Sequence, residues 1–234
     1  MSTFGLVHGA RSTSKVWRLL IPELEARGHR VMVVDLPVTD PTTTLVDYAD
    51  IAEAAFADAG EPIIAVGHSM GSGVVVQLED RMPLEGMILL TPGIFYSPEQ
   101  APDAPPALVL SDEEVAPVNG LVEPSREASR PAFWDCPEDM IEHELDQLTG
   151  QSAISLAAPF GFHPIKVPSV LIFAEEDGQV SPEWSEWAGQ ALTGKPSHAI
   201  PGSHSPHLAR PQELAEIFDG YAKEFEQTAH ASPS

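Results

Sequence analysis

The chain has 234 residues and a mass of 25.1 kDa, with 43% hydrophobic and 20% charged residues, which predicts one large globular domain or two small ones. Aspartate and glutamate number 35 against 12 lysines and arginines, and the net charge of −23 argues against nucleic acid and anionic membranes as partners. The single cysteine, Cys136, cannot form an intrachain disulfide. No apolar run approaches the roughly 20 residues that cross a bilayer. We expect a soluble, cytoplasmic protein without a secretory leader.

Short apolar runs of strand length alternate with longer amphipathic segments along most of the chain. Runs buried on both faces of a parallel sheet have this composition, and the intervening segments are then helices. The alternation predicts the α/β class, with a mostly parallel sheet of about six strands flanked by helices. The predicted strands are 3–7, 30–34, 62–67, 86–90, 167–174 and 197–200, and the predicted helices are 14–27, 44–59, 71–80, 181–192 and 211–225.

The segment from 92 to 164 breaks this alternation, because nine of the 23 prolines lie between Pro92 and Pro137. We expect an inserted helical cap, with a helix at 137–148, over a mostly apolar pocket. Its aromatic residues would contact the substrate, unless they form only the cap's own core. The candidates are Phe95, Phe133, Trp134 and Phe160, and the predicted division is a core of 1–91 and 165–226, a cap of 92–164 and a flexible tail of 227–234.

The segment Gly67-His68-Ser69-Met70-Gly71 directly follows a predicted strand and precedes a predicted helix. This arrangement is typical of a nucleophile elbow, in which the serine has a strained backbone and the flanking glycines allow strand and helix to approach closely. The alternative is a structural turn in which Ser69 only caps the helix. In the elbow, the Met70 N–H would stabilise an oxyanion, and His68 would line or pack against the pocket.

A serine nucleophile needs a base to take its proton and an acid to orient that base, in the order Ser, acid, His. We predict Asp177 as the acid, because it follows a strand and precedes a turn glycine, with Glu176 and then Glu175 as alternatives. We predict His204 as the base, because it lies at the centre of the loop after the last strand. His207 is closer to the helix start and is expected to be a surface or capping residue.

A second oxyanion donor should come from the turn after the first strand. The backbone N–H of Ala10 is the candidate, and Gly9 would allow the substrate to approach it closely. No histidine or cysteine cluster has the spacing of metal ligands. The sequence therefore predicts neither a metal nor a cofactor.

These motifs occur in the order that they have in the α/β-hydrolase superfamily, which the sequence resembles across nearly its whole core. The resemblance implies that 7–10 is the oxyanion segment, 67–71 the elbow, Asp177 the acid and 202–211 the histidine loop. It supports His204 over His207, because the family's catalytic histidine precedes a small residue. The branch most similar to this sequence contains plant methyl-ester hydrolases, hydroxynitrile lyases and their bacterial relatives, and the segment 133–139 resembles that branch's cap.

Two departures from the hydroxynitrile lyases disfavour cyanohydrin cleavage. Ser205 follows His204 where those lyases carry a lysine, and Gly9 replaces a threonine. The segment 11–15 is polar where the branch has an aromatic cluster.

We therefore predict a serine hydrolase that cleaves a carboxylic ester of a small, neutral, partly apolar substrate through an acyl-enzyme. The alternatives are a cofactor-free lyase or C–C hydrolase on the same triad, and a ligand-binding protein with slow turnover. The excess of carboxylates is also consistent with adaptation to high salt. Oligomeric state is not predicted.

Overall fold

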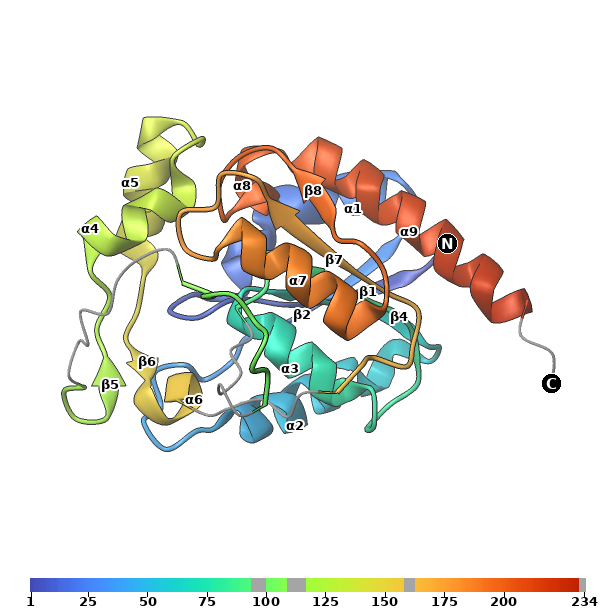
Figure 1. The fold of residues 1–234 in the computed structure, drawn as a ribbon, viewed down its shortest axis with the longest axis horizontal. Coiled ribbons are helices and arrows are strands. Elements are labelled where there is room, and N and C mark those ends of the chain that lie inside the picture. Colours follow the sequence, from blue (N-terminus) through green and yellow to red (C-terminus); the bar gives the residue numbers. More distant parts are fainter. Residues whose placement is uncertain (94–99, 109–116, 158–162, 232–234) are drawn as a thin grey trace.

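The computed structural model describes residues 1–93, 100–108, 117–157 and 163–231 (Figure 1). One sheet has the strand order β2-β1-β3-β4-β7-β8, and each neighbouring pair in it is parallel. The predicted fold class, a mostly parallel six-stranded sheet flanked by helices, is confirmed. Its strands are β1 (Thr3–Val7), β2 (Arg30–Val34), β3 (Ile63–His68), β4 (Leu84–Leu90), β7 (Ser169–Ala174) and β8 (His198–Ile200).

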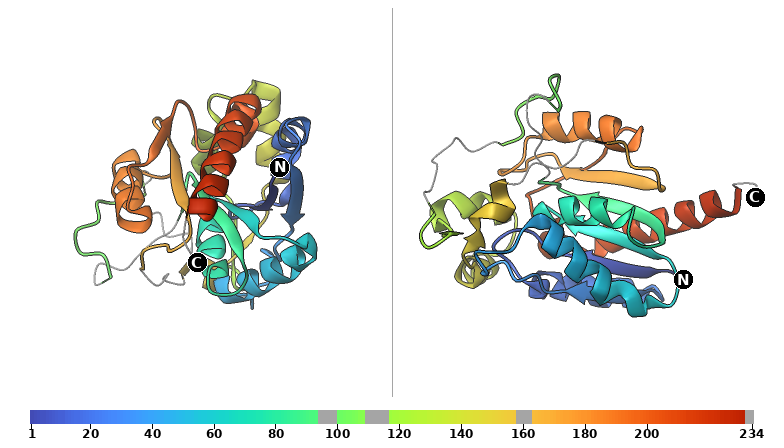
Figure 2. Two further views of the ribbon diagram at one scale, coloured as in Figure 1. Left: turned by 90° about the vertical axis from the view of Figure 1, so that its right-hand side faces the viewer. Right: turned by 90° about the horizontal axis from the view of Figure 1, so that it is seen from below.

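Helices cover both faces of this sheet (Figure 2). Successive side chains of a strand point to opposite faces, so both faces of a central strand are apolar when both are covered. In β3, Ile64 and Val66 pack into one core, while Ile63 and Ala65 pack into the other. The first core contains the 3₁₀ turn η1 (Ser14–Leu19), α1 (Leu20–Ala26) and α9 (Pro211–Ala231), and the second contains α2 (Leu45–Phe56), α3 (Met70–Leu78) and α7 (Pro182–Thr193).

The last helix is longer than the sequence analysis predicted. It continues beyond Phe225 to Ala231, so most of the expected flexible tail is helical. No glycine or proline occurs between Tyr221 and Ala231, and the alanine, glutamate and lysine of this stretch favour a helix. The loss of apolar periodicity was therefore a poor indication of where this helix ends.

The region between β4 and β7 forms a separate group of short elements at one end of the sheet (Figure 1). Phe133, Ile141 and Leu145 form a small apolar cluster there, which also contains Leu208 of the core helix α8 (Pro206–Ala209). This group therefore packs against the loop that carries His204. Its elements are β5 (Leu121–Val122), α4 (Arg126–Ser129), η3 (Arg130–Phe133), α5 (Glu138–Gln147), β6 (Gln151–Ser152) and α6 (Ala153–Ala157).

Within the described ranges, no helix has both the length and the apolar character needed to cross a membrane.

Candidate active site

Ser69 lies in the sharp turn between β3 and α3. Its backbone has φ 50° and ψ −124°, a conformation that is costly for a residue with a side chain. A Cβ on Gly71 would lie only 2.5 Å from the carbonyl oxygen of Val7, and a Cβ on Gly67 would overlap the backbone of Gly71. Both glycines are therefore required for the turn, as the sequence predicted. The Ser69 side chain makes no capping hydrogen bond to the described helix α3, which contradicts the alternative of a structural cap.

His204 and Asp177 form a close, buried polar pair at the site. The Nδ1 of His204 and the Oδ2 of Asp177 are 2.7 Å apart, and both residues are buried. Because the carboxylate can only accept, Nδ1 carries the proton and Nε2 of a neutral ring is left as a proton acceptor. The two alternative acids, Glu175 and Glu176, are exposed.

The loop after β7 keeps Asp177 ionised. Oδ1 accepts hydrogen bonds from the backbone N–H groups of Gln179 at 2.8 Å and Val180 at 3.0 Å. Burial raises the pKa of Asp177, but the nearby His204 and the hydrogen bonds from its ring and from the two amides together outweigh burial and lower the pKa below its ordinary value. The carboxylate is therefore charged near neutral pH and able to orient an imidazole.

The side chain of His68 forms a hydrogen bond with the backbone of His204. Its Nε2 donates to the carbonyl oxygen of His204 at 2.9 Å, and the hydroxyl of Thr91 donates to the same oxygen at 3.0 Å. Burial, helped by the nearby His204, lowers the pKa of His68 to about 3, so this ring stays neutral near neutral pH and acts as a hydrogen-bond donor.

His207 is not the surface or capping residue that we expected. It is 1% exposed and lines the same cavity as His204. The short helix α8 packs against η1, and this packing turns the ring inward, 4.9 Å from the ring of Trp17 and 4.4 Å from that of His68. Burial holds the pKa of His207 well below its usual range.

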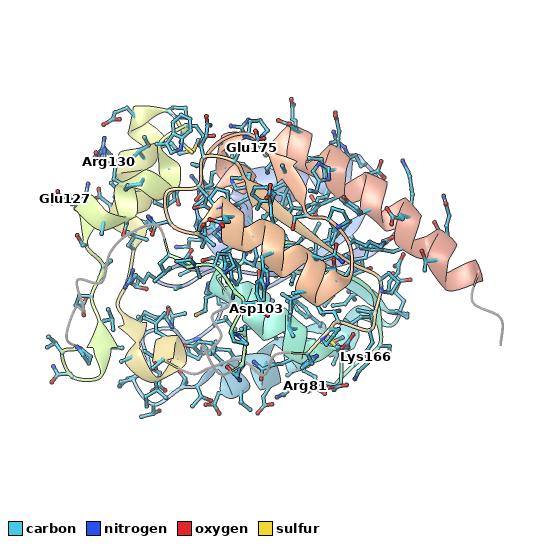
Figure 3. All side chains as sticks on the ribbon, viewed as in Figure 1. Arg81, Asp103, Glu127, Arg130, Lys166 and Glu175 are labelled. Atoms are coloured by element: carbon cyan, nitrogen blue, oxygen red, sulfur yellow. The ribbon has the colours of Figure 1, made fainter. Side chains whose placement is uncertain are left out.

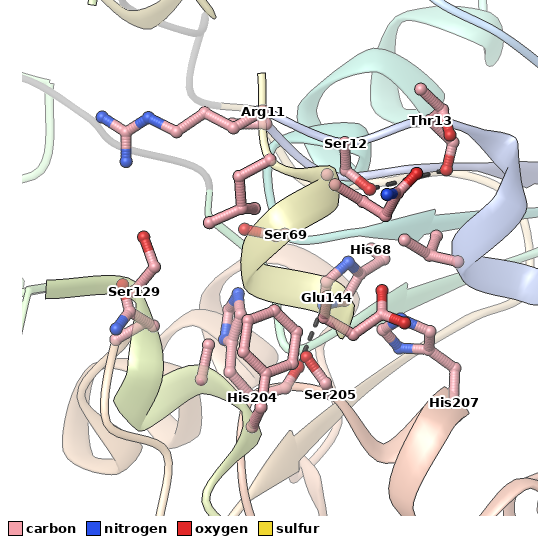
Figure 4. Close-up of a pocket in the computed structure, with 18 of the residues that line it drawn as sticks. Arg11, Ser12, Thr13, His68, Ser69, Ser129, Glu144, His204, Ser205 and His207 are labelled. Carbon is pink, nitrogen blue, oxygen red and sulfur yellow. Dashed lines mark hydrogen bonds between the residues drawn. The ribbon is translucent and has the colours of Figure 1, made fainter. Parts of the chain in front are cut away.

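Ser69 and His204 open into one cavity of about 360 Å³ (Figure 4). This volume is at the lower end of the range for sites that bind small molecules. Between these two described residues there is no hydrogen bond, an arrangement that is common before a substrate is bound. Further lining residues that the sequence analysis had predicted are Gly9, Ala10, His68 and Phe133.

The turn after β1 lies directly against Ser69. A Cβ on Gly9 would be 3.1 Å from the Cβ of Ser69, so the N–H of Ala10 belongs to a peptide beside that residue. The buried ring of His8 fixes this turn through two hydrogen bonds. Its Nε2 accepts from the Leu36 N–H at 3.0 Å, so the proton of the neutral ring is on Nδ1. Nδ1 donates it to the Gly9 carbonyl oxygen at 2.8 Å.

Three of the predicted substrate contacts, Phe95, Trp134 and Phe160, are not found among the described residues of the cavity lining. Trp134 is not among the described lining residues: it is 50% exposed, and its indole N–H donates to the carbonyl oxygen of Glu176 at 3.2 Å. The end of η3 thus turns Phe133 inward and Trp134 outward. Phe95 and Phe160 lie outside the described residues.

The sequence analysis missed several residues of the cavity. Arg11, Lys15 and Arg18 line it from the segment after β1, and Glu144 lines it from α5. The polar character of 11–15 was the only sequence signal for this wall. Gly93, after β4, was missed as well: a Cβ there would lie 3.2 Å from both Ser69 Oγ and Met70 N.

No group of three or more histidine, cysteine or acidic side chains that could hold a metal occurs in the part of the chain that the structure describes.

The chain belongs to the alpha/beta hydrolase family, which matches residues 6–217. A pyrethroid hydrolase of Sphingobium wenxiniae is 27% identical to it, over 96% of this chain and 90% of that protein. Among solved structures, a pyrethroid hydrolase from Sphingobium faniae JZ-2 has a TM-score of 0.73 at 22% identity, with 95% of this chain and 97% of the other covered. The methylesterase MES16 from Arabidopsis has a TM-score of 0.74 at 18% identity, with 95% and 99% covered. The predicted resemblance to plant methyl-ester hydrolases and bacterial relatives is confirmed.

Proposed function

We propose that this protein hydrolyses carboxylic esters of small substrates, with Ser69 as nucleophile, His204 as general base and acid, and Asp177 as the group that orients His204. The observation that carries the proposal is the 2.7 Å contact between His204 Nδ1 and Asp177 Oδ2 at a cavity that also contains Ser69 on a strained turn. That combination activates a serine hydroxyl, which is otherwise a poor nucleophile.

In the first half of the reaction, Ser69 Oγ attacks the ester carbonyl and its proton passes to His204 Nε2. The resulting oxyanion accepts hydrogen bonds from the backbone N–H groups of Met70 and Ala10. His204 then protonates the leaving alcohol, and the acyl group remains on Ser69. In the second half, His204 takes a proton from water, which attacks the acyl carbonyl. His204 then returns the proton to Ser69 Oγ as the acyl bond breaks and the acid is released.

The relatives support the same bond type, because they include a pyrethroid hydrolase and a methylesterase. Two alternatives use the same residues. A ligand-binding protein would have the same contacts and turn over slowly. A lyase or C–C hydrolase would use the same residues, although Ser205 and Gly9 depart from the hydroxynitrile lyases.

The test is the initial rate of hydrolysis of p-nitrophenyl acetate, butyrate and octanoate. We expect turnover by the unmodified chain and a loss on the order of 10⁴- to 10⁶-fold in Ser69→Ala and in His204→Ala. The matched control is Ser197→Ala, because the Ser197 hydroxyl donates to the carbonyl of Ser185 and does not line the cavity.

Substantial activity in Ser69→Ala would overturn the proposal. Absence of turnover in the unmodified chain would favour the alternatives, and conversion of a β-dicarbonyl or a cyanohydrin would then identify the lyase or C–C hydrolase.

A further inference from the structure

Most cations of this acidic chain have a carboxylate partner. Nine of the 12 lysines and arginines, all within the described residues, form ion pairs. Figure 3 shows three of these, Arg81, Arg130 and Lys166, on the outside of the fold. With about three carboxylates for each cation, an unpaired cation is the exception.

Among the described residues, Arg11, Lys15 and Arg30 are the three cations without an ion pair. Arg30 lies on β2, and its guanidinium donates to the carbonyl oxygen of Ala59 at 2.9 Å. Arg11 and Lys15 both line the active-site cavity. The two cations with the least compensation are therefore in the same cavity as Ser69.

The cavity lining has a charge opposite to that of the whole chain. Its described residues include one carboxylate, that of Glu144, and this group already binds Arg18 at 2.6 Å. The positive charges of Arg11 and Lys15 remain uncompensated there, although the net charge of the chain is −23. The expectation of a neutral substrate came from the overall charge and from the aromatic residues of the insertion, and neither indicated the positive charges of this lining.

The backbone of Arg11 is held firmly. Its N–H donates to Gln151 Oε1 at 2.9 Å, its carbonyl accepts from Thr149 N–H at 3.0 Å, and its φ is 58°. Its Nε is buried without a hydrogen-bond partner, which is costly for a cationic donor. Burial lowers the pKa of Arg11, but the ordinary value is so high that the group stays charged.

The Arg11 side chain extends to one side of the cavity, with its guanidinium apart from Ser69 and from the histidine rings (Figure 4). It therefore cannot stabilise the oxyanion at Ser69. It can contact a second group of a substrate whose ester carbonyl lies at Ser69.

We propose, on the basis of the function proposed above, that the substrate is an ester with a remote carboxylate, such as a half-ester of a dicarboxylic acid, and that Arg11 binds this carboxylate. A guanidinium binds a carboxylate through two parallel hydrogen bonds, and such a ligand would compensate a side chain whose Nε has no partner. The exposed Lys15 adds a second positive charge to the lining. Arg11 is thus the residue that determines specificity for an anionic ester.

Binding measured without turnover tests this inference. Isothermal titration calorimetry on the Ser69→Ala chain compares monomethyl succinate, glutarate and adipate with the neutral dimethyl ester of each acid. For at least one chain length, we expect the half-ester to bind about 10- to 100-fold more tightly, as a charge-assisted hydrogen bond predicts. This preference should disappear in the Ser69→Ala, Arg11→Gln double variant and return in part with Arg11→Lys.

Arg30→Gln is the matched control in the same Ser69→Ala background, because it removes a cation that also has no ion pair but lies outside the cavity. The preference for the half-ester should persist in it. Equal binding of half-ester and diester at all three lengths, or a preference that survives Arg11→Gln, would overturn the inference.

Methanol release by the chain with Ser69 intact separates this inference from the proposed function. If half-esters bind through Arg11 but no ester is hydrolysed, the carboxylate site stands and ester hydrolysis fails. If half-esters and diesters are hydrolysed with equal kcat/KM, hydrolysis stands and the carboxylate site is refuted.

Discussion

The side chain of His68 donates a hydrogen bond to the backbone of His204, from Nε2 to the carbonyl oxygen, at 2.9 Å. The residue beside the proposed nucleophile thus holds the loop that carries the proposed base. The two residues are far apart in the sequence, and this bond connects the turn after β3 to the loop after β8.

Replacing His68 with phenylalanine keeps a ring in place and removes this hydrogen bond. We expect kcat for an ester to fall about tenfold, because the His204 carbonyl keeps only the bond from Thr91 and the base is less well held. The pH dependence of kcat should not change, because the pKa of His68 is about 3 and the ring does not titrate near neutral pH. A shift of the pH profile in His68→Phe would show that His68 takes part in proton transfer.

His8 should control the orientation of the Ala10 N–H. The Gly9 carbonyl and the Ala10 N–H belong to one planar peptide and point in opposite directions, so the bond from His8 Nδ1 to Gly9 O sets the direction of the N–H. We expect His8→Phe to lower kcat about 10- to 100-fold with little change in KM, since the loss affects mainly the transition state.

His8→Asn places an amide donor near the position of Nδ1 and should restore part of the rate. An increase in KM with unchanged kcat in His8→Phe would contradict the assignment.

Asp177 should contribute to stability in a defined pH range. Because its pKa is lowered in the folded chain, its ionisation stabilises the fold above the ordinary carboxyl pKa of about 4. This contribution is lost as the pH falls through the lowered pKa. We expect Asp177→Asn to be less stable than the unmodified chain at pH 7, with the difference shrinking below about pH 4, in urea unfolding followed by circular dichroism.

The same substitution should lower kcat by about 10³- to 10⁴-fold, because asparagine can favour the wrong tautomer of His204. A stability difference that is independent of pH would argue that Asp177 is uncharged in the folded chain.

The melting temperature should rise with salt. A net charge of −23 makes the folded chain repel itself, and molar salt reduces the range of this repulsion to about 3 Å. We expect calorimetry at 0.1 and 2 M KCl to give the higher melting temperature at 2 M. An unchanged melting temperature would count against the idea that the acidity is an adaptation to high salt.

The pattern of residues along the chain determined the fold class and the order of the proposed catalytic residues. The strand at 3–7 and the strand at 30–34 match β1 and β2 in full, because a short apolar run bounded by turn residues is recognised from local sequence alone. Gly67 and Gly71 identified the elbow for a local reason as well, since the close approach around Ser69 excludes side chains at both positions.

Only the tertiary structure decided which side chains share the cavity. His207 faces inward because α8 packs on η1, and Trp134 faces outward because its indole reaches the loop after β7. The missing partner of Arg11 could not be read from the sequence, because a chain with 35 carboxylates offers many candidates. Such contacts join segments distant in sequence, and neither local propensity nor hydrophobic period carries information about them.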